Sequence, residues 1–499
     1  MQPQNGGRLY CRRRGVLAPI FSLPSKYGVG TIGAEARGFI DILAESGASV
    51  WAILPTGVTG FGDSPYQSFS SFALNPYFLD LEELIGEGLL TREECAACDF
   101  GSDEGRVDYG KLYMNRTPLL MTAYARAKDR DGYAAALEAF ESEAPWLQTY
   151  AEFMAIKDVE GGLPWYEWPE GLKNRDPAAM EEISEKISCE AGFHKFVQLK
   201  LAEQWSELVS HAMERGVLIM GDMPIYCAYD SADCWAYRKN FRFDKNGRPK
   251  EVAGVPPDYF CEDGQLWGNP VYDWYQMKKD GFAFWMERLR RAAELYDILR
   301  IDHFRGFASY YAVPAGAETA RNGLWRRAEG RRLFERAAQE HLPVEIVAED
   351  LGFITGDVKR LLKDTGFAGM QIMEFAFDDS PDNPHRNKRW NGDAKKLRNK
   401  VAYTGTHDNP PIRAWWEEQD ERTRAFAREY AGTDDLPMGI VKATAECDAR
   451  LVIIPVQDVL GLGAEARINS PGTASGNWVW RMRREDMAPF GEKLKYLFN

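Results

Sequence analysis

Short runs of apolar residues recur along this chain, and from the third run onward longer segments with helical periodicity separate them. Buried strands that alternate with helices indicate a parallel sheet, and eight such units close into a barrel. We therefore predict an α/β fold, a (β/α)8 TIM barrel with helical and loop insertions between its strands. The expected strands lie at residues 50–54, 77–81 (the weakest), 217–225, 296–302, 344–349, 370–375, 401–408 and 450–456.

Two insertions interrupt the expected barrel. We predict that residues 1–83 begin it, that 84–215 form a largely helical insertion after the second strand, and that 216–499 complete it. In the helical part, apolar and aromatic residues recur at helical spacing, which favours core packing over a ligand groove. Residues 228–275 are rich in Pro, Gly and aromatic residues, so we expect loops there, over the active site. The helical stripe comprises Phe193, Phe196, Ala202, Trp205, Val209 and Ala212.

Three of the apolar runs end in a carboxylate, namely Asp302, Glu349 and Asp408. Each acid alone is readily explained as a cap or an ion-pair partner. Three of them at the ends of the fourth, fifth and seventh barrel strands converge over one pocket, because barrel enzymes carry their active sites at the carboxyl ends of the strands. This arrangement predicts an enzyme that acts on glycosidic bonds.

Each of these residues has an expected part in that chemistry. Retaining cleavage needs one carboxylate that attacks the anomeric carbon and one carboxyl that protonates the leaving oxygen. Arg300 lies two residues before Asp302 and so points to the same side, where we expect it to keep Asp302 ionised. Glu349 must stay protonated, so its surroundings should raise its pKa. His407 and Asp408 are expected to bind sugar hydroxyls and to stabilise a cationic transition state.

The composition of the chain indicates which classes of binding partner and which cellular compartment to expect. The 499 residues carry a formal net charge of −14, which disfavours nucleic acid and anionic membranes as partners. Aromatic residues make up 13% of the chain, enough for both core packing and sugar stacking. Cys95 and Cys98 form the only C-x-x-C pair, which predicts unlinked thiols and no zinc site. The polar start and the absence of a long apolar run favour a cytoplasmic protein.

A glycine motif at residues 28–33 matches the dinucleotide-binding pattern G-x-G-x-x-G. That pattern requires a strand directly before it and an acid at the end of the next strand. A loop-like segment precedes the motif here, and the run at 50–54 ends in Pro-Thr-Gly. We therefore predict a loop that leads into a helix, whose apolar face includes Phe39, Ile40 and Leu43.

At this point the chain resembles a known family, the 4-α-glucanotransferases (amylomaltases or disproportionating enzymes) of glycoside hydrolase family 77 in the α-amylase clan. The resemblance extends from the Ser-Leu-Pro-Ser at 22–25 to the Gly-Asn-Trp-Val-Trp-Arg at 476–481. Between them lie Gly-Asp-Ser-Pro-Tyr-Gln-Ser-Phe-Ser at 62–70, Gly-Asp-Met-Pro-Ile-Tyr at 221–226, the 253–270 segment and Pro-Gly-Thr at 471–473. So many ordered motifs exclude chance agreement.

The resemblance implies a role for each matching residue. Asp302 corresponds to the nucleophile, Glu349 to the general acid/base and Asp408 to the transition-state stabiliser of the family. It implies maltooligosaccharides and α-1,4-glucans as substrates, transfer to the 4-hydroxyl of an acceptor, and neither a cofactor nor a metal. The residues expected to bind substrate are Ser64, Tyr66, Asp222, Tyr259, Trp267, Arg300, His407 and Asn477.

The chain departs from the family pattern near its third acid. After Asn409 the family usually continues with Asp-Thr, whereas Pro410 and Pro411 follow here, and residues 391–400 look rearranged. We expect activity to persist, since all three acids are present. An α-glucan hydrolase and a non-catalytic glucan-binding protein are the alternatives. The acids do not separate transfer from hydrolysis, and the sequence leaves the preferred glucan length, the formation of cyclic products and the oligomeric state open.

Overall fold

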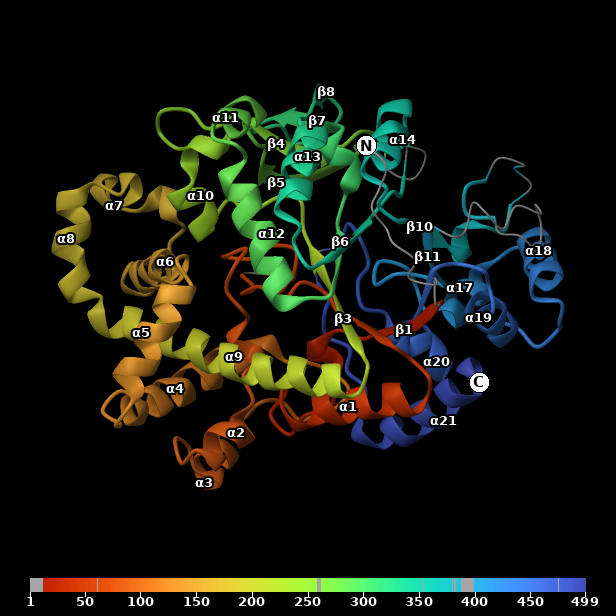
Figure 1. Ribbon diagram of the computed structural model, residues 1–499, viewed down its shortest axis with the longest axis horizontal. Coiled ribbons are helices and arrows are strands. Elements are labelled where there is room, and N and C mark those ends of the chain that lie inside the picture. Colours follow the sequence, from red (N-terminus) through yellow and green to blue (C-terminus); the bar gives the residue numbers. More distant parts are fainter. Residues whose placement is uncertain are drawn as a thin grey trace.

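The computed structural model describes residues 12–60, 62–257, 262–352, 354–378, 380, 383–386, 399–473 and 475–499. Eight parallel strands lie at its centre in the order β10-β11-β12-β1-β2-β3-β6-β9 (Figure 1). A parallel bridge between Val347 and Ala368 joins β9 to the segment before β10 and closes the sheet into a barrel. The predicted fold class is therefore confirmed. The barrel strands are β1 (Arg13–Leu17), β2 (Val50–Ala52), β3 (Leu218–Met223), β6 (Ile298–Ile301), β9 (Glu345–Ala348), β10 (Gly369–Ile372), β11 (Lys400–Tyr403) and β12 (Leu451–Pro455).

One expected strand was wrong and one real strand was missed. Residues 77–81 do not form a strand, because Pro76 and the capping side chain of Asn75 start the 3-10 helix η2 (Pro76–Phe78) there. Asp80 then caps α2. The strand that we missed is β1. It begins with two arginines, and its apolar part is too short to be recognised as a strand from the hydrophobic pattern. The two errors offset each other, so β6, β9 and β11 remain the fourth, fifth and seventh strands.

Close strand packing explains the glycine in β1. Gly15 pairs with Val50 of β2, and a Cβ atom there would lie 2.4 Å from the Val50 carbonyl oxygen. Only glycine allows the backbones to approach this closely. The chain therefore begins its barrel more than 30 residues earlier than its hydrophobic pattern indicates.

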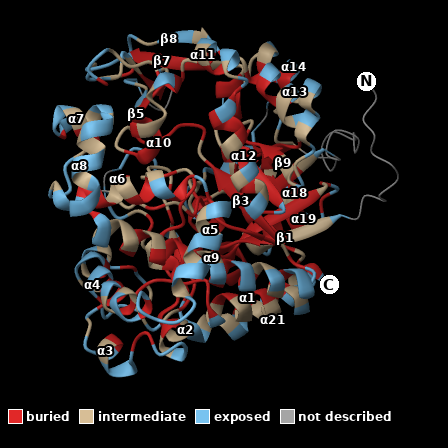
Figure 2. Ribbon diagram, turned by 60° about the vertical axis from the view of Figure 1, so that its left-hand side comes forward, coloured by how far each residue is buried: buried red, intermediate tan, exposed pale blue. Residues whose placement is uncertain are grey.

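Helices surround the barrel, and burial follows this layering, with buried strands inside and exposed outer helix faces (Figure 2). The predicted helix after the glycine motif is α1, and it buries Phe39, Ile40 and Leu43. Within the described part of the chain, no helix is long and apolar enough to cross a membrane. The helices that surround the barrel are α1 (Ala34–Glu45), α12 (Ala283–Leu295), α13 (Gly330–Glu340), α14 (Gly356–Thr365), α17 (Ile412–Glu418), α18 (Glu421–Ala431), α19 (Met438–Ala445), α20 (Val456–Leu460) and α21 (Met487–Phe498).

Between β2 and β3 the chain forms a group of helices, most of which lie to the left of the barrel in Figure 1. The long helix α9 buries Phe193, Phe196 and Trp205, which confirms core packing as the role of the aromatic stripe. Cys95 and Cys98 are free thiols, as predicted. The group comprises α2 (Leu81–Gly86), α3 (Arg92–Ala96), α4 (Tyr109–Ala127), α5 (Tyr133–Glu143), α6 (Leu147–Val159), α7 (Glu170–Asn174), α8 (Pro177–Lys186) and α9 (Ser188–Glu214).

A second, antiparallel sheet lies beside the barrel in the order β5-β4-β7-β8. We expected loops over residues 228–275, but this segment supplies two strands of the second sheet, the short helix α10 and the start of α11. Residues Glu251–Gly254 of this segment pair with Tyr311–Pro314 of β7, and the prolines at 256 and 257 end the strand. The elements are α10 (Ala232–Ala236), β4 (Glu251–Val255), β5 (Gln265–Pro270), α11 (Trp274–Lys279), β7 (Ser309–Pro314) and β8 (Leu324–Arg327).

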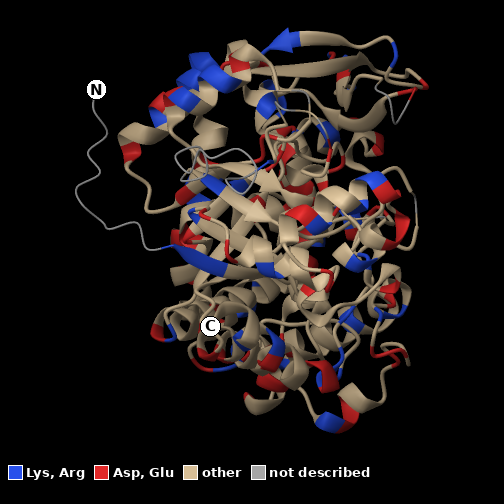
Figure 3. Ribbon diagram, turned by 90° about the vertical axis from the view of Figure 1, so that its right-hand side faces the viewer, with Lys and Arg blue, Asp and Glu red and all other residues tan. Residues whose placement is uncertain are grey.

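Ion pairs hold the amino-terminal ends of the barrel strands together. The Glu345 carboxylate of β9 forms one ion pair with Arg13 of β1, with Oε2 and Nη2 2.6 Å apart. It forms a second with Arg450, just before β12, with Oε1 and Nη2 also 2.6 Å apart. Figure 3 shows the basic start of β1 in blue. The pairs stabilise this end of the barrel, opposite the end at which the three acids lie.

Candidate active site

Strand register places two of the predicted acids side by side. Ile301 of β6 pairs with Ala348 of β9, so the next residues, Asp302 and Glu349, stand at neighbouring strand ends. Neighbouring strands are about 4.8 Å apart, which suits the separation of about 5–5.5 Å between the carboxyls of retaining enzymes. The Asp302 N–H also donates to the Met223 carbonyl at 3.0 Å, which fixes the strand end.

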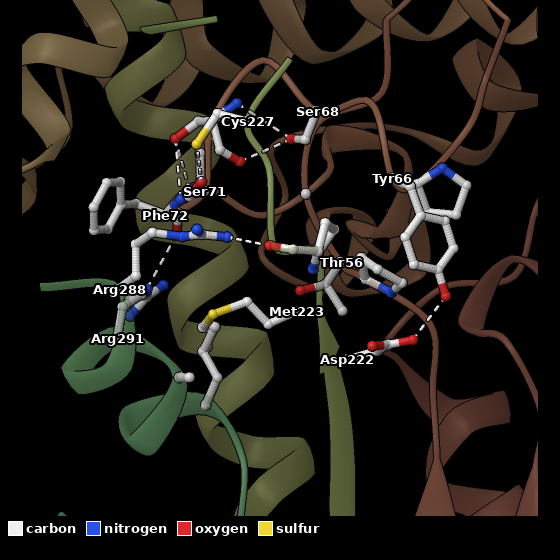
Figure 4. Close-up of a pocket in the computed structure, with 18 of the residues that line it drawn as sticks. Thr56, Tyr66, Ser68, Ser71, Phe72, Asp222, Met223, Cys227, Arg288 and Arg291 are labelled. Carbon is white, nitrogen blue, oxygen red and sulfur yellow. Dashed lines mark hydrogen bonds between the residues drawn. The ribbon is translucent and has the colours of Figure 1, made fainter. Parts of the chain in front are cut away.

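Arg300 links Asp302 to the neighbouring strand β3. Arg300 and Asp222 are register partners, and the Arg300 guanidinium contacts Asp222 Oδ2 at 2.5 Å and Asp302 Oδ1 at 3.2 Å. The Tyr66 hydroxyl donates to the same Asp222 oxygen at 2.7 Å, as Figure 4 shows. Asp222 Oδ1 is buried and has no hydrogen-bond partner. A cavity of about 60 Å³ adjoins Tyr66 and Asp222.

Asp408 stands on the loop that follows β11, with its side chain 46% exposed. His407 lies beneath Tyr66, with the two rings stacked 5.2 Å apart at 17°. Its Nε2 atom is 3.3 Å from Asp408 Oδ1. Burial lowers the pKa of His407, so this imidazole is neutral at pH 7. The structure thus brings Asp408, His407 and Tyr66 together with the Arg300 network.

Glu349 is held by two backbone N–H groups. His303 donates to Oε2 at 2.7 Å, and Leu351 donates to Oε1 at 2.9 Å. His303 adopts the left-handed conformation, with φ of 48°, which is uncommon outside glycine and typical of functional sites. Burial nevertheless raises the pKa of Glu349, against the opposing effects of Arg300 and of these N–H groups. This direction agrees with our expectation for a general acid.

The pKa of Asp302 differs from our expectation. We expected Arg300 to keep that pKa low, but burial outweighs the arginine and raises it well above its ordinary value. The charge of Glu349 is one of the nearby charges that also raise the pKa of Asp302. Arg300 contacts Asp302, whereas no Lys or Arg nitrogen in the described ranges lies within 4.0 Å of Glu349. The Arg300 contact therefore favours the ionised form of Asp302, against the effect of burial.

Trp267 reaches the site from the second sheet. It lies in β5, and its ring packs edge-on against His303 with centroids 4.7 Å apart. Since His303 follows Asp302 directly, the indole adjoins the end of β6. Tyr259, which we also expected at the site, falls outside the described residues.

Ser64 and Asn477 make contacts within their own loops. The Ser64 hydroxyl accepts the Tyr66 N–H at 3.3 Å and so shapes the turn that presents Tyr66. Asn477 Oδ1 accepts the Ser470 N–H at 2.9 Å, and its Nδ2 donates to the Thr473 carbonyl at 3.1 Å. Both residues support loops beside the site, and their contact with substrate remains a prediction.

Two residues of the site were not assigned from the sequence. Asn469 donates to Asp408 Oδ1 at 2.6 Å. Trp478 is buried in the left-handed conformation, with φ of 63°, and packs against the rings of Tyr66 and His407 at 5.9 and 6.0 Å. A bulky residue at positive φ is an outlier that must be held by its surroundings. The Gly-Asn-Trp motif could have drawn attention to Trp478, but nothing local indicates the partner of Asn469.

The two prolines after Asn409 fit the local structure. Pro411 precedes α17, and the Ile412 N–H donates to Asp458 Oδ1 at 2.7 Å. Thr404 at the end of β11 donates to the other oxygen of the same buried carboxyl. Asp458 therefore fixes both ends of the loop that carries Asp408. Proline has no backbone N–H to donate, and these bonds to Asp458 do not require one at positions 410 and 411.

Comparisons with known proteins identify the family of the chain. The family model described as 4-alpha-glucanotransferase covers residues 18–487. The 4-alpha-glucanotransferase of Thermus thermophilus is 43% identical, with 97% of each chain covered. The chloroplastic/amyloplastic 4-alpha-glucanotransferase of Solanum tuberosum is 40% identical over 94% of this chain and 82% of that one. The structure of amylomaltase from Streptococcus agalactiae in complex with acarbose shares 37% identity, with a TM-score of 0.94 and 98% of each chain covered.

These matches run through nearly the whole chain and include the segments that bear all three acids. The structural match agrees with the barrel fold. The chain belongs to the 4-alpha-glucanotransferase family, glycoside hydrolase family 77, and is an enzyme that transfers segments of α-glucans.

Proposed function

We propose that this enzyme transfers α-1,4-glucan segments by a retaining double displacement, with Asp302 as nucleophile, Glu349 as acid/base and Asp408 as transition-state stabiliser. The main support is the register of β6 and β9, which sets Asp302 and Glu349 at adjacent strand ends. In the first step Asp302 attacks the anomeric carbon while Glu349 gives its proton to the leaving oxygen. In the second step Glu349 takes the proton from the acceptor hydroxyl, which attacks the same carbon and releases Asp302.

The donor sugar in this proposal occupies the space between Tyr66 and the acids. The Tyr66 ring, backed by His407 and Trp478, offers an aromatic surface for a sugar face. Asp222 Oδ1 is buried without a partner and is suited to accept a sugar hydroxyl. Charge that develops on the sugar ring faces the carboxylate of Asp408. The donors and acceptors that we infer are maltooligosaccharides and longer α-1,4-glucans, with the acceptor 4-hydroxyl as the attacking group.

A maltotriose incubation tests both transfer and retention. We expect glucose together with a ladder of longer maltooligosaccharides, all joined by α linkages, because two successive displacements restore the starting configuration. Chromatography would resolve the ladder, and the anomeric proton signals in NMR would report the linkage. New β linkages would contradict the double displacement, and reducing ends released in step with donor consumption would indicate a hydrolase.

Trp267 is proposed to favour the acceptor sugar over water at the glycosyl-enzyme. Its ring borders His303 next to the nucleophile and gives an apolar surface on which an acceptor can stack. We expect Trp267→Ala to raise the ratio of hydrolysis to transfer on the order of 5-fold, as an exposed intermediate meets more water. Reducing-sugar release measured alongside glucose release would give the ratio.

Tyr275→Ala is the matched control for this substitution. Tyr275 is 69% exposed on α11, and its ring contacts Lys279 rather than the active site. This variant should keep the wild-type ratio of hydrolysis to transfer. If Trp267→Ala also keeps that ratio, the indole has no part in excluding water.

A further inference from the structure

The carboxylate of Asp408 is held by the loop that follows β12 and α20. Asn469 Nδ2 donates to Asp408 Oδ1 at 2.6 Å, and His407 Nε2 lies 3.3 Å from the same oxygen. Among the described residues, none donates a hydrogen bond to Asp408 Oδ2. One oxygen of the carboxylate is therefore fixed by the protein, and the other is left for another partner.

The main chains of the two loops are joined by separate contacts. Arg467 Nη2 donates to the Asp408 carbonyl at 2.9 Å, and Arg467 Nε donates to the Asn469 carbonyl at 2.8 Å. The Asn469 N–H donates to the His407 carbonyl at 3.2 Å. These three bonds hold the backbone without the side chain of Asn469. Its amide is thus free to act on the carboxylate alone.

The Asp408 carboxylate requires a side-chain hydrogen-bond donor to orient it. Its side chain is 46% exposed and stands on a loop beyond the end of β11, so β-sheet hydrogen bonds do not orient it. A neutral amide donor favours the ionised carboxylate and selects one rotamer, without adding a positive charge that would oppose a cationic sugar. A lysine or arginine in the same place would neutralise the charge that the transition state requires.

We propose that Asn469 is the positioning residue for Asp408: its side-chain amide holds Oδ1 so that Oδ2 faces the reacting sugar. This inference rests on the proposed stabilising role of Asp408. The amide acts through the carboxylate and does not touch substrate. Its contribution therefore falls mainly on kcat, because an interaction that strengthens only in the transition state leaves ground-state binding unchanged.

Asn469→Asp gives a pH signature for this role. At low pH the new carboxyl keeps a proton and donates it to Asp408 Oδ1 in place of the amide. As pH rises, the proton leaves, two carboxylates repel each other, and Asp408 turns away. We expect kcat relative to wild type to fall on the order of 10-fold from the acidic to the alkaline end, with little change in KM.

Charges around the site limit which other titrations contribute. His407, Arg467 and Asp302 are the charged or titratable groups near Asp408 and residue 469. Burial lowers the pKa of His407. Dividing the kcat of the variant by that of the wild type at each pH removes the titrations common to both. Asn246→Asp on an exposed turn makes the same change of charge away from the site, and its ratio should stay flat.

Asn469→Ala separates positioning from folding and from the role of Asp408 itself. It removes the donor at every pH, so kcat should fall uniformly while circular dichroism and KM stay near wild type. A flat ratio for Asn469→Asp would overturn the proposal, as would failure of both variants to fold. If Asp408→Ala keeps full activity, the role of Asp408 fails, whereas a flat ratio with an inactive Asp408→Ala rejects Asn469 alone.

Discussion

Replacement of Asp302 by alanine should lower kcat for maltotriose roughly 10⁴-fold or more, the size of loss found when a nucleophile is removed. The reason is geometric, since no other described carboxylate follows the end of β6 beside Glu349 and Arg300. Maltooligosaccharide binding should persist, because Tyr66 and Asp222 keep their mutual contact. Steady-state rates and isothermal titration calorimetry would measure the two quantities.

Asp131→Ala provides the control for the Asp302 substitution. Asp131 is exposed and lies between α4 and α5, so its loss should change neither rate nor binding. Activity of Asp302→Ala within about 10-fold of wild type would show that another group attacks the anomeric carbon. Loss of binding together with activity would point instead to a damaged site, which the Asp131 variant would not share.

Replacement of Glu349 by glutamine should lower kcat for maltotriose about 10²- to 10⁴-fold, as expected when a general acid is lost. Burial raises the pKa of Glu349, so in the wild type the acid form persists to a higher pH than for an ordinary carboxyl. The alkaline limb of the rate profile therefore reports loss of this proton. For Glu349→Gln, the pH profile of the rate of glycosyl-enzyme formation should lack this alkaline limb.

A donor whose leaving group needs no proton distinguishes acid catalysis from structural damage. With α-maltosyl fluoride, Glu349→Gln should form the glycosyl-enzyme at close to the wild-type rate, since fluoride departs unaided. Fluoride release in the first turnover, followed with an ion-selective electrode, gives that rate. An equally large loss with both donors would contradict the assignment of Glu349 as acid.

The strand ends that carry the chemistry could be predicted from the sequence, because each acid follows a short apolar run of the right length. Asp302 and Glu349 accordingly follow β6 and β9 directly, whereas Asp408 lies on a loop beyond β11, which ends at Tyr403 rather than at residue 408. The first strand could not be predicted in the same way. Its leading residues, Arg13 and Arg14, are polar because they stand at the ion-paired end of the barrel, and Gly15 serves backbone packing.

Features that depend on long-range contacts also escaped prediction. The pKa of Asp302 depends on how much water the completed barrel removes, which the neighbouring Arg300 does not reveal. Asn469 reaches Asp408 across 61 positions of sequence. The second sheet arises because β4 finds its partner in β7, about 60 residues later, and a local reading of its prolines and glycines indicated only loop.

The identity of the nucleophile is tested most directly by trapping the glycosyl-enzyme. Glu349→Gln mixed with α-maltosyl fluoride lacks the base that activates an acceptor, so the intermediate should accumulate. Mass spectrometry of the denatured protein should then show the addition of one maltosyl unit, and peptide mapping should place it on Asp302. An adduct on Asp408 or another residue, or full turnover without any adduct, would contradict the double displacement through Asp302.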